Sequence, residues 1–116
     1  MSVFGTNTLT YFATSITLAT TKTSLLDYIN GTTAGAGHTN ADITACREVD
    51  FLADSTNGGT VYVGDLDLST TDYGTALSAN GTQISRKSLV EDRIDLSDIY
   101  LLGSAAGEIV HVSLFL

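Results

Sequence analysis

The sequence predicts an all-β fold, a single antiparallel β-sandwich with a jelly-roll-like arrangement. Three observations support this. Short segments rich in β-branched and aromatic residues recur along the chain. Turn signals made of Gly and Asn separate these segments at intervals of roughly 8–12 residues. The chain of 116 residues contains no proline, so its turns must depend on Gly, Asn, Asp, Ser and Thr. This length suits one domain.

The first part of the chain predicts an extended arm. Residues 1–22 contain short apolar alternations, such as Leu9 with Tyr11, that are typical of extended backbone. We therefore expect an N-terminal extended arm over residues 1–22, which adds a strand to a partner, and a β-sandwich domain over residues 23–116.

One short helix is expected directly after the arm. The apolar residues 25–29 follow Thr23 or Ser24, either of which is a suitable N-cap, and Asn30 precedes a glycine that stops the helix. The small, polar residues 31–40 show no apolar periodicity and predict a loop.

The second half of the chain contains the clearest strand patterns. Asn57 and Asn80, each followed by glycine, predict turns between strands, because Asn and Gly accept positive φ. The closing strand places His111 and Ser113 on the face opposite to its apolar residues. The expected strands cover residues 47–53, 60–64, 83–89, 99–102 and 109–116.

The charge balance excludes several classes of partner. The chain has 13 acidic and 5 basic residues and a formal net charge of −8. Binding to nucleic acid and binding to an anionic membrane surface both depend on clustered Lys and Arg residues. No stretch approaches the ~18 apolar residues that a membrane span needs, and the first residues lack the pattern of a secretory signal. We expect neither a nucleic-acid nor a membrane partner.

An acidic segment in the middle of the chain raises the possibility of a calcium site. Asp65 and Asp67 offer the carboxylate oxygens that Ca²⁺ prefers. The EF-hand pattern is not met, because Thr70 occupies the position of its obligatory glycine. We expect no metal; Asp65 and Asp67 should lie on the solvent side of a strand end whose other side carries Leu66 and Leu68.

The remaining chemical candidates do not predict catalysis. Residues 35–40 resemble part of a dinucleotide fingerprint, but they do not connect a strand to a helix. Cys46 with His38 or His111 suggests a thiol nucleophile and its base, but a cysteine at the start of an apolar strand is usually buried and inert. No active-site roles converge, so we expect no enzymatic activity and no cofactor.

Motifs in the second half of the chain resemble a recurrent pattern in small virion proteins of tailed bacteriophages. The likeness covers about residues 49–114. It consists of Val61-Tyr62-Val63-Gly64-Asp65, Gly74 with Leu77, Gly81 with Ile84, the run DLSDIYLLG from Asp95 to Gly103, Ala105-Ala106-Gly107, and Ile109-Val110-His111-Val112. The resemblance implies a compact β-sandwich on a virus particle, most often as a capsid decoration (cement) protein.

This resemblance also implies a partner and a location. The partner is the major capsid protein, and the location is the outer surface of the capsid, after synthesis in the host cytoplasm. A homo-oligomer is expected, and the symmetry of such binding sites on a shell suggests three subunits, a trimer. The negative charge suits the outside of a particle, away from packaged DNA.

The arm offers the expected contacts to the capsid. Its apolar residues lie in an otherwise polar segment and can anchor it by burial or by pairing with a sheet edge. These partner-binding candidates are Val3, Phe4, Leu9, Tyr11 and Phe12.

Two alternative functions stay open. The first is a tail or head–tail accessory protein of the same fold, which differs only in its position on the particle. The second is a carbohydrate-binding module for host adsorption, for which exposed aromatic residues would be the mark. The chain has no Trp, and most of its five Tyr and four Phe fall in strand patterns.

Overall fold

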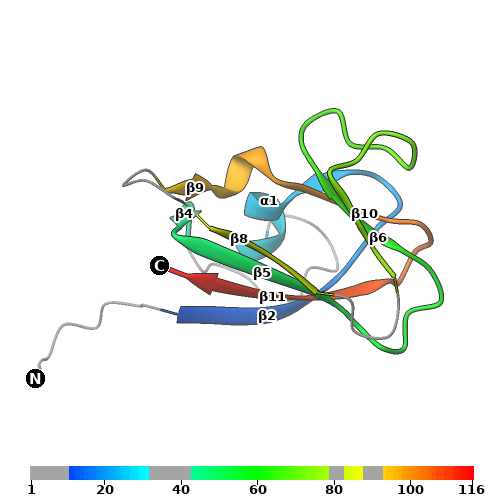
Figure 1. The fold of residues 1–116 in the computed structure, drawn as a ribbon, viewed down its shortest axis with the longest axis horizontal. Coiled ribbons are helices and arrows are strands. Elements are labelled where there is room, and N and C mark those ends of the chain that lie inside the picture. The colour runs from blue at the N-terminus through cyan, green and yellow to red at the C-terminus, as the bar shows by residue number, and fades with distance from the viewer. Residues whose placement is uncertain (1–10, 32–42, 79–82, 88–92) are drawn as a thin grey trace, which may run out of the picture.

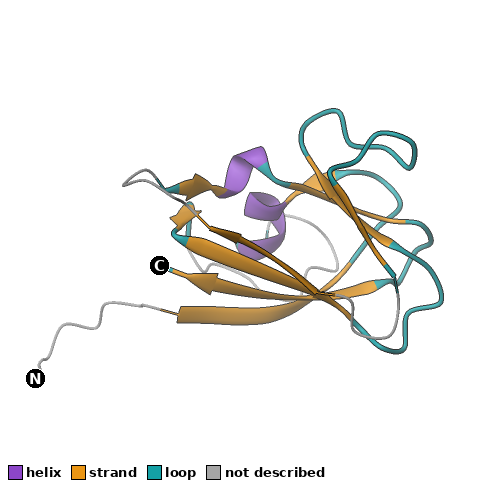
Figure 2. Ribbon diagram, in the orientation of Figure 1, coloured by secondary structure: helices purple, strands orange, loops and turns teal. Residues whose placement is uncertain are grey.

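The structure is a computed structural model that describes residues 11–31, 43–78, 83–87 and 93–116. Within these ranges, two four-stranded sheets, a two-stranded ribbon, one short α-helix and one 3-10 turn surround a single hydrophobic core (Figures 1 and 2). Every strand pair that the structure describes is antiparallel. The predicted all-β class is confirmed, and the finer arrangement as a β-sandwich with a jelly-roll-like topology stays a prediction.

The first sheet, here called the long-strand sheet, has the order β2-β11-β5-β8. Its strands are β2 (Tyr11–Thr17), β11 (Ile109–Phe115), β5 (Glu48–Ala53) and β8 (Gln83–Lys87). Side chains alternate along β5 and β11, because successive residues of a strand point to opposite faces. Phe51 is fully buried opposite Val112, which confirms the alternation expected from the sequence.

The second sheet, here called the short-strand sheet, has the order β3-β10-β6-β7. Its strands are β3 (Thr23–Ser24), β10 (Tyr100–Gly103), β6 (Val61–Gly64) and β7 (Thr75–Leu77). A separate ribbon joins β4 (Ala45–Cys46) to β9 (Ile94–Asp95), and the 3-10 helix η1 (Leu96–Asp98) follows directly. Buried residues from both sheets belong to one core.

The helix α1 (Leu25–Ile29) lies where the sequence predicts it. Ser24 is its N-cap and accepts a hydrogen bond on Oγ from the backbone N–H of Asp27 at 3.1 Å. Asn30 ends the helix, and its N–H donates to the Leu26 carbonyl at 3.0 Å. The helix buries Leu25, Tyr28 and Ile29 in the core, and this burial stabilises an element too short to persist alone.

The expected N-terminal arm does not extend to residue 22. Residues 11–17 form β2, which pairs with β11 along its whole length. Ile16 is 0% exposed and Leu18 is 2% exposed, so burial fixes this segment in the domain. The structure therefore places residues 11–17, which were expected in the arm, within the long-strand sheet, and residues 1–10 lie outside the described part of the chain.

The turn after β5 lies where Asn57 predicts it, but it connects the two sheets instead of closing a hairpin. The Asn57 amide replaces a backbone partner for Ile109: its Nδ2 donates to the Ile109 carbonyl at 2.8 Å, and its Oδ1 accepts from the Ile109 N–H at 2.8 Å. The Gly59 N–H donates to the buried carboxylate of Glu108 at 2.8 Å. These bonds join the loop to the start of β11.

The segment after β6 also differs from the prediction. Leu68 is buried, but Leu66 is 61% exposed, so the two do not share an inner face. The Asp65 carbonyl accepts from the Leu68 N–H at 3.0 Å, and the Asp65 carboxylate accepts from the Asp67 N–H at 2.9 Å. These bonds turn the chain and end the alternation that a strand would require.

Candidate functional site

An exposed aromatic contact of the long-strand sheet lies at the start of β2 and the end of β11, beside the C-terminus (Figure 1). Tyr11 is 49% exposed and Phe115 is 37% exposed. Their ring centroids are 5.0 Å apart and the rings are inclined by 59°. The Tyr11 hydroxyl donates to Ser113 Oγ at 3.2 Å, which holds the ring on the outer face. We call Tyr11 and Phe115 the aromatic pair of the β2 end.

The structure places two of the five partner-binding candidates. Tyr11 is exposed on the outer face, whereas Phe12 is half-buried and packs against the core. These neighbours point to opposite faces because β2 is a regular strand. The other three candidates, Val3, Phe4 and Leu9, lie outside the described residues.

Phe115 is the residue that the sequence prediction missed. It lies directly opposite Tyr11 in the β2–β11 register. The signal was present in the alternation of β11, since Phe115 shares the outer face with His111 and Ser113. Only the pairing of β2 with β11 reveals that the two aromatic residues meet.

A chain of hydrogen bonds crosses the outer face of the same sheet. Ser15 Oγ lies 2.8 Å from Nδ1 of His111, and Nε2 of His111 lies 2.7 Å from Oδ1 of Asp54. Hydrogen bonds from Thr56, followed by that from His111, lower the pKa of Asp54 to about 2. The Asp54 carboxylate is therefore negative at neutral pH and favours the proton on Nε2.

These three residue types also form catalytic triads, but this arrangement differs from a triad in two ways. The hydroxyl of Ser15 bonds to Nδ1 and the carboxylate of Asp54 to Nε2, the reverse of the triad assignment. The residues also lie on a sheet face, and none of them lines either of the hollows described below. The geometry indicates a structural role, in which these hydrogen bonds connect β2, β11 and the end of β5.

Cys46 has the surroundings of a structural thiol. It is fully buried, and burial raises the pKa of its thiol to about 11 although the charge of Arg93 acts in the opposite direction. A protonated, buried thiol is a poor nucleophile. His111 is engaged with Ser15 and Asp54 and does not serve Cys46 as a base. His38, the other expected partner, lies outside the described residues.

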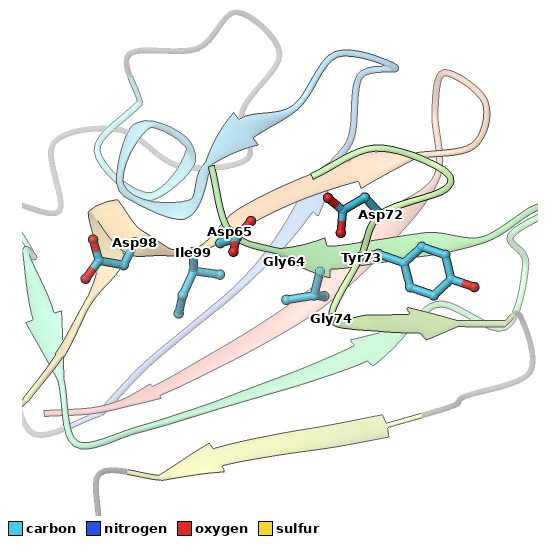
Figure 3. A pocket seen from close by; sticks show the side chains of 8 residues that line it. Gly64, Asp65, Asp72, Tyr73, Gly74, Asp98 and Ile99 are labelled. Atoms are coloured by element: carbon cyan, nitrogen blue, oxygen red, sulfur yellow. The ribbon is translucent and has the colours of Figure 1, made fainter. Parts of the chain in front are cut away.

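A second candidate site is an acidic hollow beside η1 (Figure 3). It has a volume of about 270 Å³, and a neighbouring hollow of about 370 Å³ shares Asp65 and Asp98 with it. Asp72 and Tyr73 approach from the loop before β7, and Tyr73 contacts Tyr62 with ring centroids 4.9 Å apart. The first hollow is lined by Val63, Gly64, Asp65, Asp72, Tyr73, Gly74, Asp98 and Ile99.

The hollow offers carboxylate oxygens and an aromatic surface. The nearby Lys22 ammonium donates to the backbone carbonyl of Leu66. Among the residues that the structure describes, no group of three or more His, Cys, Asp or Glu has the arrangement of a metal site. What the surface can do is accept hydrogen bonds from hydroxyl or cationic groups beside an exposed Tyr73 ring.

Neither a protein-family model, nor a curated protein, nor a solved structure matches the chain. Within the described ranges, no helix is long and apolar enough to cross a membrane.

Proposed function

We propose that the protein is a non-enzymatic virion structural protein, a capsid decoration (cement) subunit that binds and stabilises the assembled phage head. The observation that carries the proposal is the aromatic pair of the β2 end, Tyr11 and Phe115, exposed on the outer face of the long-strand sheet. The motifs of the second half of the chain, which resemble those of small phage virion proteins, supply the class of partner.

The surface around this pair combines uncharged and acidic residues. Its neighbours along the strands, Ala13 and Ser113, are small and uncharged, whereas Glu48 lies opposite Phe115 and Asp50 lies opposite Ser113 in the β5–β11 register. Charged residues are depleted in the buried core of an interface and accepted at its rim, so the rings are the proposed centre of the contact and the two carboxylates its rim. Tyr and Phe bury roughly 150–250 Å² each. Covering the exposed parts of both rings would contribute on the order of 4 kcal/mol at ~25 cal/mol per Å², before ordering costs are subtracted.

The charge of the chain supports the outer surface of the head as the location. A net charge of −8 opposes contact with packaged DNA, whose binding partners are basic. The major capsid protein is the proposed partner, and synthesis takes place in the host cytoplasm. A homo-oligomer belongs to the same proposal, because a repeating shell presents symmetry-related binding sites.

A carbohydrate-binding module for host adsorption is the second candidate function. The specific observation in its favour is the contact of Tyr62 with the exposed Tyr73 beside the carboxylate-lined hollow. An aromatic ring next to hydrogen-bond acceptors suits a sugar face and its hydroxyl groups. A tail or head–tail accessory protein of the same fold would use the aromatic pair at another position on the particle.

The two aromatic sites allow one experiment to separate these functions. Heads that lack the protein are mixed with purified wild type, with Y11S/F115S and with the matched control Y73S, and co-sedimentation is measured. We expect at least a tenfold loss of head binding for Y11S/F115S, because anchors of this kind dominate interface energies, and no change for Y73S. A variant without residues 1–10 tests the arm separately, and Tyr11 and Phe12 remain because they belong to β2.

Other outcomes would contradict the leading proposal. Binding to tails instead of heads would favour the accessory protein. Binding to host cell-wall glycans that is lost in Y73S and kept in Y11S/F115S would favour the carbohydrate-binding module. Equal head binding by all variants would show that the aromatic pair does not contribute to binding the head.

A further inference from the structure

Two hollows meet where β6 ends and η1 leads into β10. The first hollow, drawn in Figure 3, has a volume of about 270 Å³ and includes Tyr73, which is 47% exposed. The second hollow has a volume of about 370 Å³ and includes Tyr100. Asp65 and Asp98 line both hollows. The shared acidic residues therefore lie where the hollows meet, and each hollow adds an aromatic side chain.

The loop between β6 and β7 gives the first hollow a defined shape. The Gly74 N–H donates to the Val63 carbonyl at 2.9 Å, which holds the end of the loop against β6. Within the loop, the Ser69 N–H donates to the Asp72 carbonyl at 2.8 Å. These bonds position Asp72 and Tyr73 at the hollow before any ligand binds, and such preorganisation lowers the cost of ordering on binding.

The charge of the two hollows is negative. Among the described residues, no Lys or Arg forms an ion pair with Asp65, Asp72 or Asp98. The Lys22 ammonium donates to the Leu66 carbonyl beside the second hollow, but Lys22 lines neither hollow. The ligand that complements this surface is therefore a cation.

We propose that the two hollows bind a small organic cation, a guanidinium group on an apolar stem. A guanidinium is planar, so it donates paired hydrogen bonds to a carboxylate and also stacks on an aromatic face. Asp65 and Asp98 supply the acceptors, and the ring of Tyr73 supplies the face. The exposed side chain of Leu66, which lines the second hollow, contacts the stem.

The size of the hollows favours a small molecule. Pockets for small ligands measure roughly 300–1,000 Å³, and each hollow lies at or near the lower end of this range. A neutral sugar would use the same acceptors, but it lacks the charge that complements the acidic residues. The inference does not depend on binding to a phage head, and it competes with the carbohydrate-binding alternative for the same surface.

A titration followed by ¹⁵N NMR tests the proposal on the full chain. The probe is N-acetyl-L-arginine amide, and we expect saturable shifts of the amide signals of Gly64, Gly74 and Asp98. The dissociation constant should be roughly millimolar, as for a ligand of few atoms. The matched probe, N-acetyl-L-citrulline amide, has nearly the same shape without the charge and should bind about tenfold more weakly or not at all.

Two variants with the same change of charge localise the effect. D98N removes a carboxylate shared by both hollows and should weaken binding of the arginine probe about threefold or more. D67N removes an exposed carboxylate that lines neither hollow and should change binding less than twofold. Circular dichroism verifies that both variants remain folded.

Several outcomes would overturn the proposal. They are equal binding of the arginine and citrulline probes, equal losses in D98N and D67N, and shifts confined to residues outside the two hollows. Equal or tighter binding of a neutral sugar, N-acetylglucosamine, at the same signals would favour the carbohydrate-binding module instead. A peptide with a central arginine that binds at least tenfold more tightly than the single-residue probe would assign the surface to a protein partner.

Discussion

The two four-stranded sheets share one core but are held together in different ways. The long-strand sheet has strands of seven, seven, six and five residues, and the short-strand sheet has strands of two, four, four and three. Long strands gain stability from continuous backbone ladders and alternating side chains. Strands of two to four residues offer few such bonds, so the short-strand sheet needs other contacts.

Polar side chains supply those contacts at the ends of the short strands. Just before β6, the Thr60 N–H donates to Ser104 Oγ at 2.9 Å. The Gly59 N–H donates to the buried Glu108 at 2.8 Å, and the loop after β6 closes on Asp65. In the long-strand sheet, the corresponding contacts lie across the outer face, between Ser15 and His111 for example. Regular alternation along long strands therefore stabilises the long-strand sheet, whereas hydrogen bonds of individual polar side chains stabilise the short-strand sheet.

The largest expected effect comes from the core of the long-strand sheet. Phe51 is fully buried in β5, between β11 and β8. F51A should lower the free energy of unfolding by about 3–5 kcal/mol, because it removes buried apolar surface and leaves a cavity. Urea denaturation measures the change. L66A truncates a side chain that is 61% exposed, and its effect should stay within about 0.5 kcal/mol; similar losses in both variants would contradict the assignment of Phe51 to the core.

The difference between the sheets also explains which parts of the fold could be predicted. The strands at residues 47–53 and 109–116 were recognisable because a half-buried strand in a long ladder alternates over many residues. The helix was recognisable from its caps at Ser24 and Asn30. The exposure of Leu66 could not be predicted from the pattern, because hydrogen bonds of Asp65 turn the chain and end the apparent alternation.

The candidate sites depend on contacts that a linear pattern does not contain. Ser15 and His111 are 96 residues apart, and His111 and Asp54 are 57 apart. Tyr11 and Phe115 become neighbours only because β2 joins the sheet. The expectation of a free arm hid this pairing, since it assigned Tyr11 to a segment outside the domain. The sequence pattern alone therefore does not predict which residue of β11 lies opposite each residue of β2.

The next effect tests whether one polar residue connects the two sheets. Asn57 binds both the N–H and the carbonyl of Ile109, each at 2.8 Å. N57A should lower the free energy of unfolding by about 1–3 kcal/mol, because two backbone groups lose their partner. T70A, at an exposed threonine, is the control and should change stability little. A loss for N57A no larger than for T70A would show that the connection depends on backbone contacts alone.

The smallest expected effect concerns the outer face of the long-strand sheet and depends on pH. The folded-state pKa of Asp54 is about 2, below its ordinary value of 3.8. A lowered carboxyl pKa stabilises the fold above pH 3.8, and this contribution disappears as the pH falls toward 2. D54N lacks the contribution at every pH. Urea denaturation should therefore show wild type more stable than D54N at pH 5, with the difference shrinking between pH 4 and 2.

The exposed Asp67 provides a control with the same change of charge. D67N removes a carboxylate without touching the bonds to His111 and Thr56, so it should not reproduce the pH-dependent difference. H111A separates the contributions further: hydrogen bonds from Thr56 are the larger cause of the lowered pKa of Asp54, so part of the pH dependence should persist in this variant. A D54N profile parallel to that of wild type from pH 5 to 2 would mean that the hydrogen bonds to Asp54 contribute nothing to the long-strand sheet.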